Sequence, residues 1–162
     1  MPSTTTYFQT WDRREAPLDD QAMQQHLRAL AVSLAAPRRA GLLVCPRETF
    51  HSALETARHL SDETDTLAAP LAWICENGRA AEALFATLVP SRKAARRFSL
   101  PALDGGKPRV QVILEEIVKH GDAALTSQRL TDCLRAFDEV RALEMDELWA
   151  VPAALASCLM WD

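Results

Sequence analysis

The chain has 162 residues, of which 48% are hydrophobic, and a net charge of −4 at pH 7. This length and composition are typical of one globular domain with its own core and argue against wholesale disorder. The acidic balance argues against a general nucleic-acid binder, because such binding needs a basic surface. No stretch approaches the roughly 18 to 20 apolar residues that a membrane-spanning helix requires.

The N-terminus and the cysteines indicate the compartment. The first residues lack both the basic start and the apolar run of a secretory signal. The four cysteines stand far apart without a CxxC pair, and each lies on an apolar helical face. We therefore expect a reducing, cytoplasmic location, with the inner face of the membrane as the place of any peripheral contact.

The chain order predicts an all-α fold of about six helices in antiparallel pairs. Residues 1–17 are polar and are expected to form a flexible arm, and residues 18–162 a single helical domain. Helices are expected at about residues 19–36, 46–60, 67–88, 108–120, 126–140 and 144–160.

Caps and breakers set the expected helix ends. Asp19 or Asp20 and Thr126 or Ser127 are natural N-caps, and Pro46 and Pro108 suit first-turn positions. Residues 61–65 are expected to form an acidic loop, residues 98–107 an irregular stretch with a turn at Gly105–Gly106, and residues 42–45 the one possible strand. Pro152 falls inside the last helical pattern, so a kink is expected there.

Motifs for catalysis or metal binding are weak. His51 and His59 are not spaced for one helical metal pair, and the four histidines show no metal pattern, so no metal and no cofactor are expected. Cys45, near Arg47 and His51, is the best placed thiol for a nucleophile, yet a buried structural cysteine is the favoured interpretation. The carboxylate pairs Glu115–Glu116 and Glu144–Glu147 have ordinary surface spacing.

One basic cluster is the strongest charge feature. Its four cations precede Phe98 at helical spacing and consist of Arg92, Lys93, Arg96 and Arg97. They could rest on an anionic membrane surface or bind another anionic partner, although a solvated basic face is the favoured interpretation.

Several blocks, in order, resemble the N-terminal helical region of the cyclic β-1,2-glucan synthases, which are large membrane-bound bacterial glycosyltransferases. The Trp-Leu-Leu-Asp-Asn core of that family is similar to residues 73–77 here, and its aromatic-x-Leu-Pro segment to residues 98–101. Its Pro-Arg-Val helix start is similar to residues 108–110, and its Glu-Leu-Trp-Ala-Leu-Pro element to residues 147–152. The resemblance covers roughly residues 25 to 160.

Two departures from the family pattern matter. Glu144 stands where the family has a helix-capping Thr, and Gly78 stands where an aromatic residue usually follows the Asn. An acidic residue still favours a helix start through the helix dipole. The family's sugar-nucleotide site, its metal-binding carboxylates and its membrane spans have no counterpart in these residues, so the resemblance implies no catalytic residue and no enzymatic activity for this chain alone.

We therefore expect a non-catalytic docking or scaffold module, either a piece or a short relative of such an enzyme. Its partner would be the remaining domains of a glucan synthase-like enzyme or another protein. The expected motif pairs the last helix with the helix bearing Trp73, and its residues are Trp73, Asn77, Leu100, Pro101, Glu147, Leu148, Trp149 and Pro152. Asn77 would bind backbone groups near Gly78 or Leu100–Pro101, and Met160 and Trp161 would be partly exposed.

Two alternatives stay open. A small standalone carbohydrate-binding protein or enzyme would need a Trp-lined pocket into which Glu76, Asn77, His120 and Glu147 converge. A regulatory adaptor would use the basic cluster at residues 92–97 against lipid or an acidic partner, and its binding would weaken steeply with salt.

Overall fold

The computed structural model is all-α, as the sequence predicts. The residues that the structure describes are 16–35, 37–41, 43, 47–63, 68–88, 100–103, 106–121 and 125–159. Six helices account for most of them: α1 (Asp20–Ser33), α2 (Arg47–Glu63), α3 (Ala68–Leu88), α5 (Arg109–Lys119), α6 (Ser127–Asp138) and α7 (Met145–Leu159). Among the described helices, none combines the length and apolar character needed to cross a membrane.

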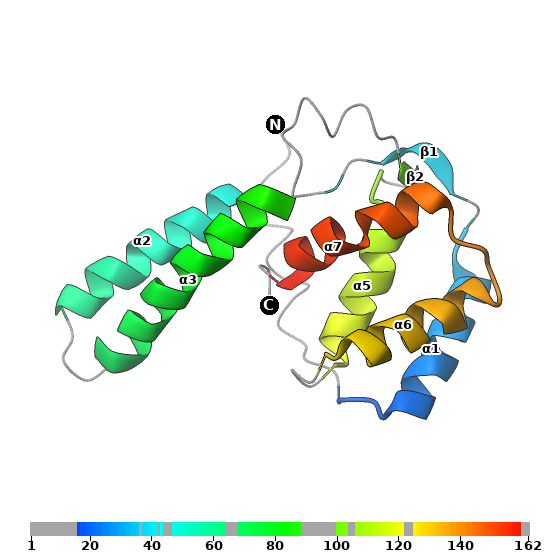
Figure 1. Cartoon of the computed structure of the whole chain (residues 1–162), viewed down its shortest axis with the longest axis horizontal. Coiled ribbons are helices and arrows are strands. Elements are labelled where there is room, and N and C mark those ends of the chain that lie inside the picture. Colours follow the sequence, from blue (N-terminus) through cyan, green and yellow to red (C-terminus); the bar gives the residue numbers. More distant parts are fainter. Residues whose placement is uncertain are drawn as a thin grey trace.

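The helices form a body and a projecting hairpin. In the body, α1 packs on α6 and α5 packs on α7. The antiparallel pair α2 and α3 extends away from the body (Figure 1), and α3 approaches α7 at one end of the pair. The expected arm at residues 1–17 falls largely outside the described residues, as does the basic cluster at residues 92–97.

The predicted caps are confirmed at two helices. The Asp19 carboxylate accepts a hydrogen bond from the backbone N–H of Ala22 at 2.8 Å, and the Thr126 hydroxyl accepts one from the N–H of Arg129 at 3.1 Å. Each bond satisfies a donor that the first turn leaves without an intrahelical acceptor. The helix α7 continues through Pro152 to Leu159, and the kink there stays a prediction.

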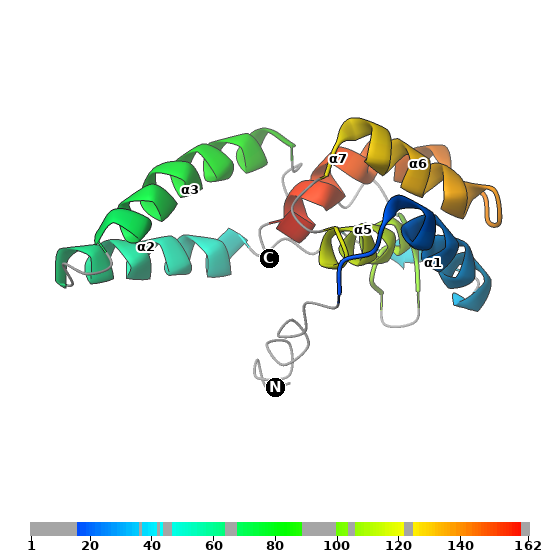
Figure 2. The same cartoon turned by 90° about the horizontal axis from the view of Figure 1, so that it is seen from below.

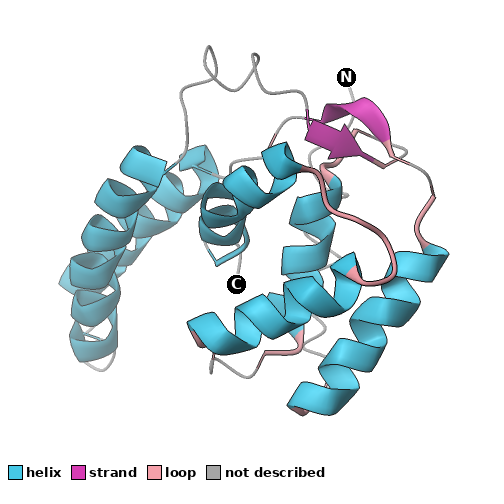
Figure 3. Cartoon of the chain, turned by 45° about the vertical axis from the view of Figure 1, so that its right-hand side comes forward, coloured by secondary structure: helices cyan, strands magenta, loops and turns pink. Residues whose placement is uncertain are grey.

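A two-stranded antiparallel ladder corrects the expectation for two loops. Strand β1 (Arg38–Gly41) pairs with β2 (Leu100–Ala102), beside the ends of α5 and α7 (Figure 3). The strand thus lies just before residues 42–45, and part of the stretch expected to be irregular is extended and buried. Gly106 has φ +82° in the turn after β2, a conformation that favours glycine, which fits the turn expected there.

The expected acidic loop at residues 61–65 is wrong in its first half. The helix α2 runs on to Glu63, and the structure describes nothing of residues 64–67. An acidic stretch after an amphipathic pattern does not itself end a helix, because Glu is a good helix former and no proline or glycine intervenes.

The core of the body follows the predicted helical stripes. Met23, Leu27, Ile113, Leu114 and Phe137 are fully buried, with aliphatic side chains and two thiols around them. Val140 is 44% exposed, because α6 ends at Asp138 and the chain turns before reaching Val140.

The helices α2 and α3 of the hairpin bury fewer apolar side chains among the described residues, apart from the core of the body. Leu54 and Ala57 of α2 are buried, and Gly78 of α3 is buried against them. A Cβ atom at residue 78 would clash with Cδ2 of Leu54, so the two helices approach each other closely here and the Leu54 side chain would have to move to admit a larger residue. Neither Leu54 nor Ala57 belongs to the cluster that fills the body.

The buried thiols give a first testable prediction. Burial raises the pKa of the Cys158 thiol to about 12, and burial also raises the pKa of Cys133. We expect both to resist iodoacetamide at pH 8 in the folded protein and to react once it is unfolded, as mass spectrometry of the alkylated peptides would show. The half-buried Cys75 serves as the internal comparison.

The same shifts predict how stability depends on pH. An unfolded thiol loses its proton near a pH of about 8.5. Below that pH the contribution of Cys158 to stability is complete, and it is lost as the pH rises toward its folded pKa of about 12. A Cys158→Ala variant should therefore lose less stability than the wild type between these two pH values. Equal losses of stability in the variant and the wild type would contradict a raised pKa of the Cys158 thiol.

Candidate docking surface on the last helix

The helix α7 buries mainly small residues and exposes several large apolar ones, while its Val151 and Leu155 are half-buried against the core. Its buried face consists mainly of Ala153, Ala154, Ser157 and Cys158. Its exposed face carries five apolar residues, which we call the α7 stripe: Met145, Leu148, Trp149, Pro152 and Leu159. Met145, Trp149 and Leu159 are 66%, 79% and 53% exposed. A surface helix normally places its large apolar residues on the core, so the orientation of α7 is unusual.

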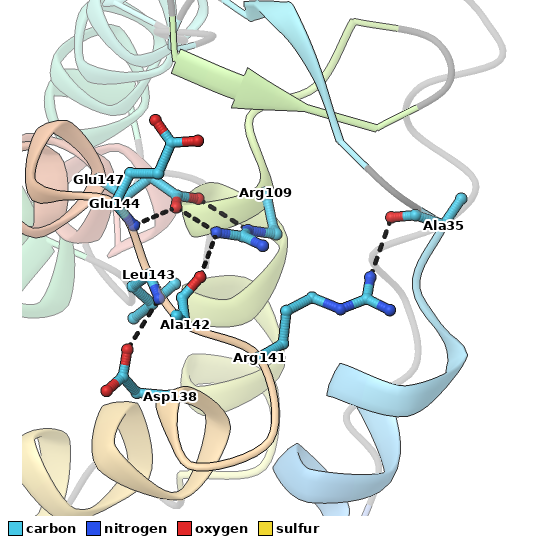
Figure 4. A network of polar contacts seen from close by, with 8 residues as sticks. All are labelled: Ala35, Arg109, Asp138, Arg141, Ala142, Leu143, Glu144 and Glu147. Atoms are coloured by element: carbon cyan, nitrogen blue, oxygen red, sulfur yellow. Dashed lines mark hydrogen bonds and ion pairs between the residues drawn. The ribbon is translucent and has the colours of Figure 1, made fainter.

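A buried ion pair fixes this orientation. Glu147 lies on α7 and is 0% exposed, and Arg109 opens α5 and is 3% exposed. The carboxylate of Glu147 accepts hydrogen bonds from two nitrogens of the Arg109 guanidinium, of which Nε lies 2.9 Å from Oε1 (Figure 4). Two parallel bonds between planar groups fix orientation as well as distance.

The carboxylate of Glu147 also caps its own helix. Its Oε2 accepts a hydrogen bond from the backbone N–H of Glu144 at 2.9 Å (Figure 4). This is the backward half of a capping box, in which the acidic side chain three residues inside the helix binds the N–H of the cap residue. The spacing of Glu144 and Glu147 predicts ordinary surface charges. This prediction is wrong for Glu147, because α5 places the buried guanidinium of Arg109 beside it.

Further contacts hold the segment between α6 and α7, which leads up to this ion pair. The Arg109 guanidinium donates to the carbonyl of Ala142 at 3.0 Å and lies 5.8 Å from the centre of the Phe137 ring. Asp138 accepts from the N–H of Leu143 at 2.8 Å, and Arg141 donates to the carbonyl of Ala35 after α1 at 3.1 Å (Figure 4). The link between α6 and α7 is thereby held from α1, α5 and α6.

The helices α3 and α7 contact each other, but neither Trp149 nor Trp73 is buried in that contact. Trp149 and Trp73 are 79% and 65% exposed, so neither packs between helices. Trp73 belongs to the first turns of α3, and the beginning of α3 lies at the end of the hairpin that points away from α7 (Figure 1). Asn77 donates to the carbonyl of Trp73 in its own helix at 2.8 Å and does not serve Gly78 or the β2 segment.

The other expected motif residues divide by burial. Leu100 and Pro101 are buried in β2, Leu148 is 43% exposed, and Pro152 is exposed. Met160 and Trp161 lie outside the described residues, as does Cys45. The structure therefore brings together Glu147, Leu148, Trp149 and Pro152 on α7, and it separates them from Trp73 and Asn77 on α3.

The convergent pocket of the carbohydrate-binding alternative is not formed by the residues named for it. Glu76 and Asn77 are exposed on α3, whereas Glu147 is buried against Arg109. His120 is buried at the end of α5, where its ring contacts His26 of α1. These groups lie on three helices and face different partners.

The structure brings together one group of side chains that could hold a metal ion, among the described residues, where the sequence predicts none. His26, Glu116 and His120 each offer a ligand atom, and these atoms lie within 4.8 Å of one another. The spacing of Glu116 and His120, four residues apart on one helix, was a usable signal. The sequence gives no sign that His26 joins them, because His26 lies on α1 and comes close to Glu116 only in the folded structure.

Comparison with known protein families, with curated proteins and with solved structures found no match to this chain. The resemblance to the N-terminal region of the cyclic β-1,2-glucan synthases therefore stays a prediction.

Proposed function

We propose that this chain is a non-catalytic helical docking module and that the α7 stripe is its docking surface. The observation that carries the proposal is the orientation of α7. Leu148 and Trp149 are exposed, whereas the neighbouring Glu147 is fully buried between α7 and α5. A buried, doubly bonded ion pair maintains an orientation that leaves large apolar area in water. Such a surface gains free energy when a partner covers it.

The spacing of the stripe fits a helix as the bound element. Met145, Leu148, Trp149 and Pro152 follow one another at steps of three, one and three residues, which places them on one side of α7. A partner helix with its own apolar face can lie along such a side. The exposed Asp146 and the half-buried Glu144 flank its beginning, and α7 holds no Lys or Arg, so a partner helix with basic flanks is complementary in charge.

The resemblance supplies the candidate partner. It points to the remaining domains of a cyclic β-1,2-glucan synthase-like enzyme, met at the cytoplasmic side with at most peripheral membrane contact. In that setting the chain contributes a docking surface, and the catalytic groups belong to the partner.

Binding to a synthase that lacks its own N-terminal helical region tests this proposal. The purified chain should bind that protein in size-exclusion and biosensor measurements. Trp149→Ala should weaken binding by about 2 kcal/mol or more, roughly thirtyfold in Kd, as expected for a central Trp in an interface. The matched control is Val32→Ala, because Val32 of α1 is 71% exposed but lies outside the stripe.

Three outcomes would count against this function. They are no association, association that Trp149→Ala leaves unchanged, and equal weakening by Val32→Ala. Calorimetric titration with β-1,2-glucan oligosaccharides and with a nucleotide sugar is the complementary measurement. Saturable heat with either would favour a carbohydrate-binding or enzymatic role instead.

A further inference from the structure

The second chemical feature of the body lies where α1 meets the end of α5. Nε2 of His26 is 2.9 Å from Oε2 of Glu116, and Nε2 of His120 is 3.6 Å from the same oxygen. The two imidazole rings are 5.1 Å apart between centroids and inclined at 62°. Two imidazole nitrogens thus face one carboxylate oxygen from two different elements of the fold.

The backbone favours one tautomer of His120. Nδ1 of His120 lies 3.4 Å from the carbonyl oxygen of Ala16, which can only accept, and this contact favours the proton on Nδ1. In the neutral ring Nε2 then presents its lone pair toward Oε2 of Glu116. A positive charge between the two atoms, whether a proton or a metal ion, makes that arrangement favourable. A ring N–H given to a backbone carbonyl is also how metal-binding histidines are usually oriented.

We propose that His26, Glu116 and His120 form a binding site for a divalent transition metal ion of the Zn²⁺ class. Zn²⁺ takes imidazole nitrogens at about 2.0–2.1 Å and carboxylate oxygens at about 2.0–2.2 Å, so tetrahedral ligands stand roughly 3.3–3.5 Å apart. The observed separations of 2.9 and 3.6 Å lie on either side of that value. All three ligand atoms lie within 4.8 Å of one another, so a single ion placed between them would draw the side chains together.

The surroundings of the site favour a bound cation and leave one of its coordination positions open. His120 is the C-cap of α5, and the negative end of a helix dipole attracts positive charge. The His26 and Glu116 side chains are 35% and 24% exposed, so solvent or a partner group can supply a fourth ligand. Lys119 approaches the other oxygen of Glu116 at 3.9 Å, which leaves Oε2 to the metal.

The site would fasten the start of the fold to its core. The N–H of Leu18 donates to the carbonyl of His120 at 3.2 Å, and the segment that leads into α1 passes beside the end of α5 (Figure 2). A metal ion held by α1 and α5 would link these two elements directly. Its role is therefore structural, and it is independent of the α7 stripe.

The test is calorimetric titration of the untagged, EDTA-treated chain with ZnSO₄ at pH 7.5. The wild type should bind one ion and show a higher Tm in its presence. His26→Ala and Glu116→Gln should each weaken binding at least tenfold and abolish the Tm shift, whereas the exposed His59→Ala on α2 should change neither. Co²⁺ substitution adds a spectroscopic check, because nitrogen and oxygen ligation gives no thiolate charge-transfer band.

Four results would overturn the metal site. They are absence of binding heat, stoichiometric binding that both ligand variants leave intact, equal loss in His59→Ala, and a strong thiolate band with Co²⁺. The first would mean that the two histidines and Glu116 contact one another without holding a metal ion. His120→Ala is left out of the primary set because His120 is buried, and its loss could disturb folding.

Discussion

Replacing Glu147 by Ala is expected to lower the free energy of unfolding by about 3–5 kcal/mol, the range for breaking one partner of a buried ion pair. The physical reason is the charge left behind. The guanidinium of Arg109 is 3% exposed and would keep one carbonyl, that of Ala142, while losing both carboxylate contacts. The N–H of Glu144 would lose its acceptor as well. Urea unfolding followed by circular dichroism measures the change.

Two controls separate this effect from a general sensitivity to lost charges. Glu139→Ala removes a partner of Arg28 in an ion pair whose side chains are 41% and 51% exposed, and it should cost no more than about 1 kcal/mol. The double variant Arg109→Met with Glu147→Leu removes both buried charges and should be more stable than Glu147→Ala alone. If Glu147→Ala lowers the free energy of unfolding by no more than Glu139→Ala does, the ion pair does not hold α7.

The ion pair also links stability to the proposed docking surface. If Arg109 and Glu147 set the orientation of α7, the double variant should weaken partner binding even where its stability is restored. Glu139→Ala should leave binding unchanged.

Local chemistry explains what could be predicted from the sequence. The caps at Asp19 and Thr126 and the periodic apolar residues of α1, α5 and α6 act through neighbours within one or two turns. The helix class and the stripes of the core therefore followed from the residue order. These same signals do not show which face of α7 turns inward, and Trp149, which lies in an apolar helix, is 79% exposed.

Tertiary partners explain what could not be predicted. Which face of α7 turns inward depends on Arg109, which lies 38 residues before Glu147. The contact of His26 with Glu116 depends on how α5 packs beside α1, and 90 residues separate the two side chains in the sequence. The strand β2 exists because β1 pairs with it, and Pro101 gave no local sign of a ladder. In each case the missing information was the identity of a distant neighbour.

At Gly78 the chain differs from the family that it resembles. The family it suggests has an aromatic residue after the Asn, whereas here a Cβ atom alone would lie within 3.2 Å of three atoms of the Leu54 side chain. The close contact of α2 and α3 at this point is therefore a property of this chain. The hairpin would have to open to accept the family's residue.

Replacing Gly78 by Phe is accordingly expected to destabilise the hairpin by about 3 kcal/mol, the upper part of the usual range for overpacking. Hydrogen exchange should show the loss of amide protection in α2 and α3, while α5 and α6 stay protected, because the hairpin residues lie outside the body's core cluster. Equal loss of protection throughout would contradict a separate hairpin contact.

A pair of smaller changes isolates the cause. Gly78→Ala should gain about 1 kcal/mol from helix propensity, yet we expect a net loss, because the added methyl group meets Leu54. With Leu54→Ala in place the clash is gone, and the same Gly78→Ala change should become stabilising by about 1 kcal/mol. The effect of one substitution would thus reverse its sign with the residue opposite. If Gly78→Ala stabilises both backgrounds equally, Leu54 does not limit the approach of the two helices.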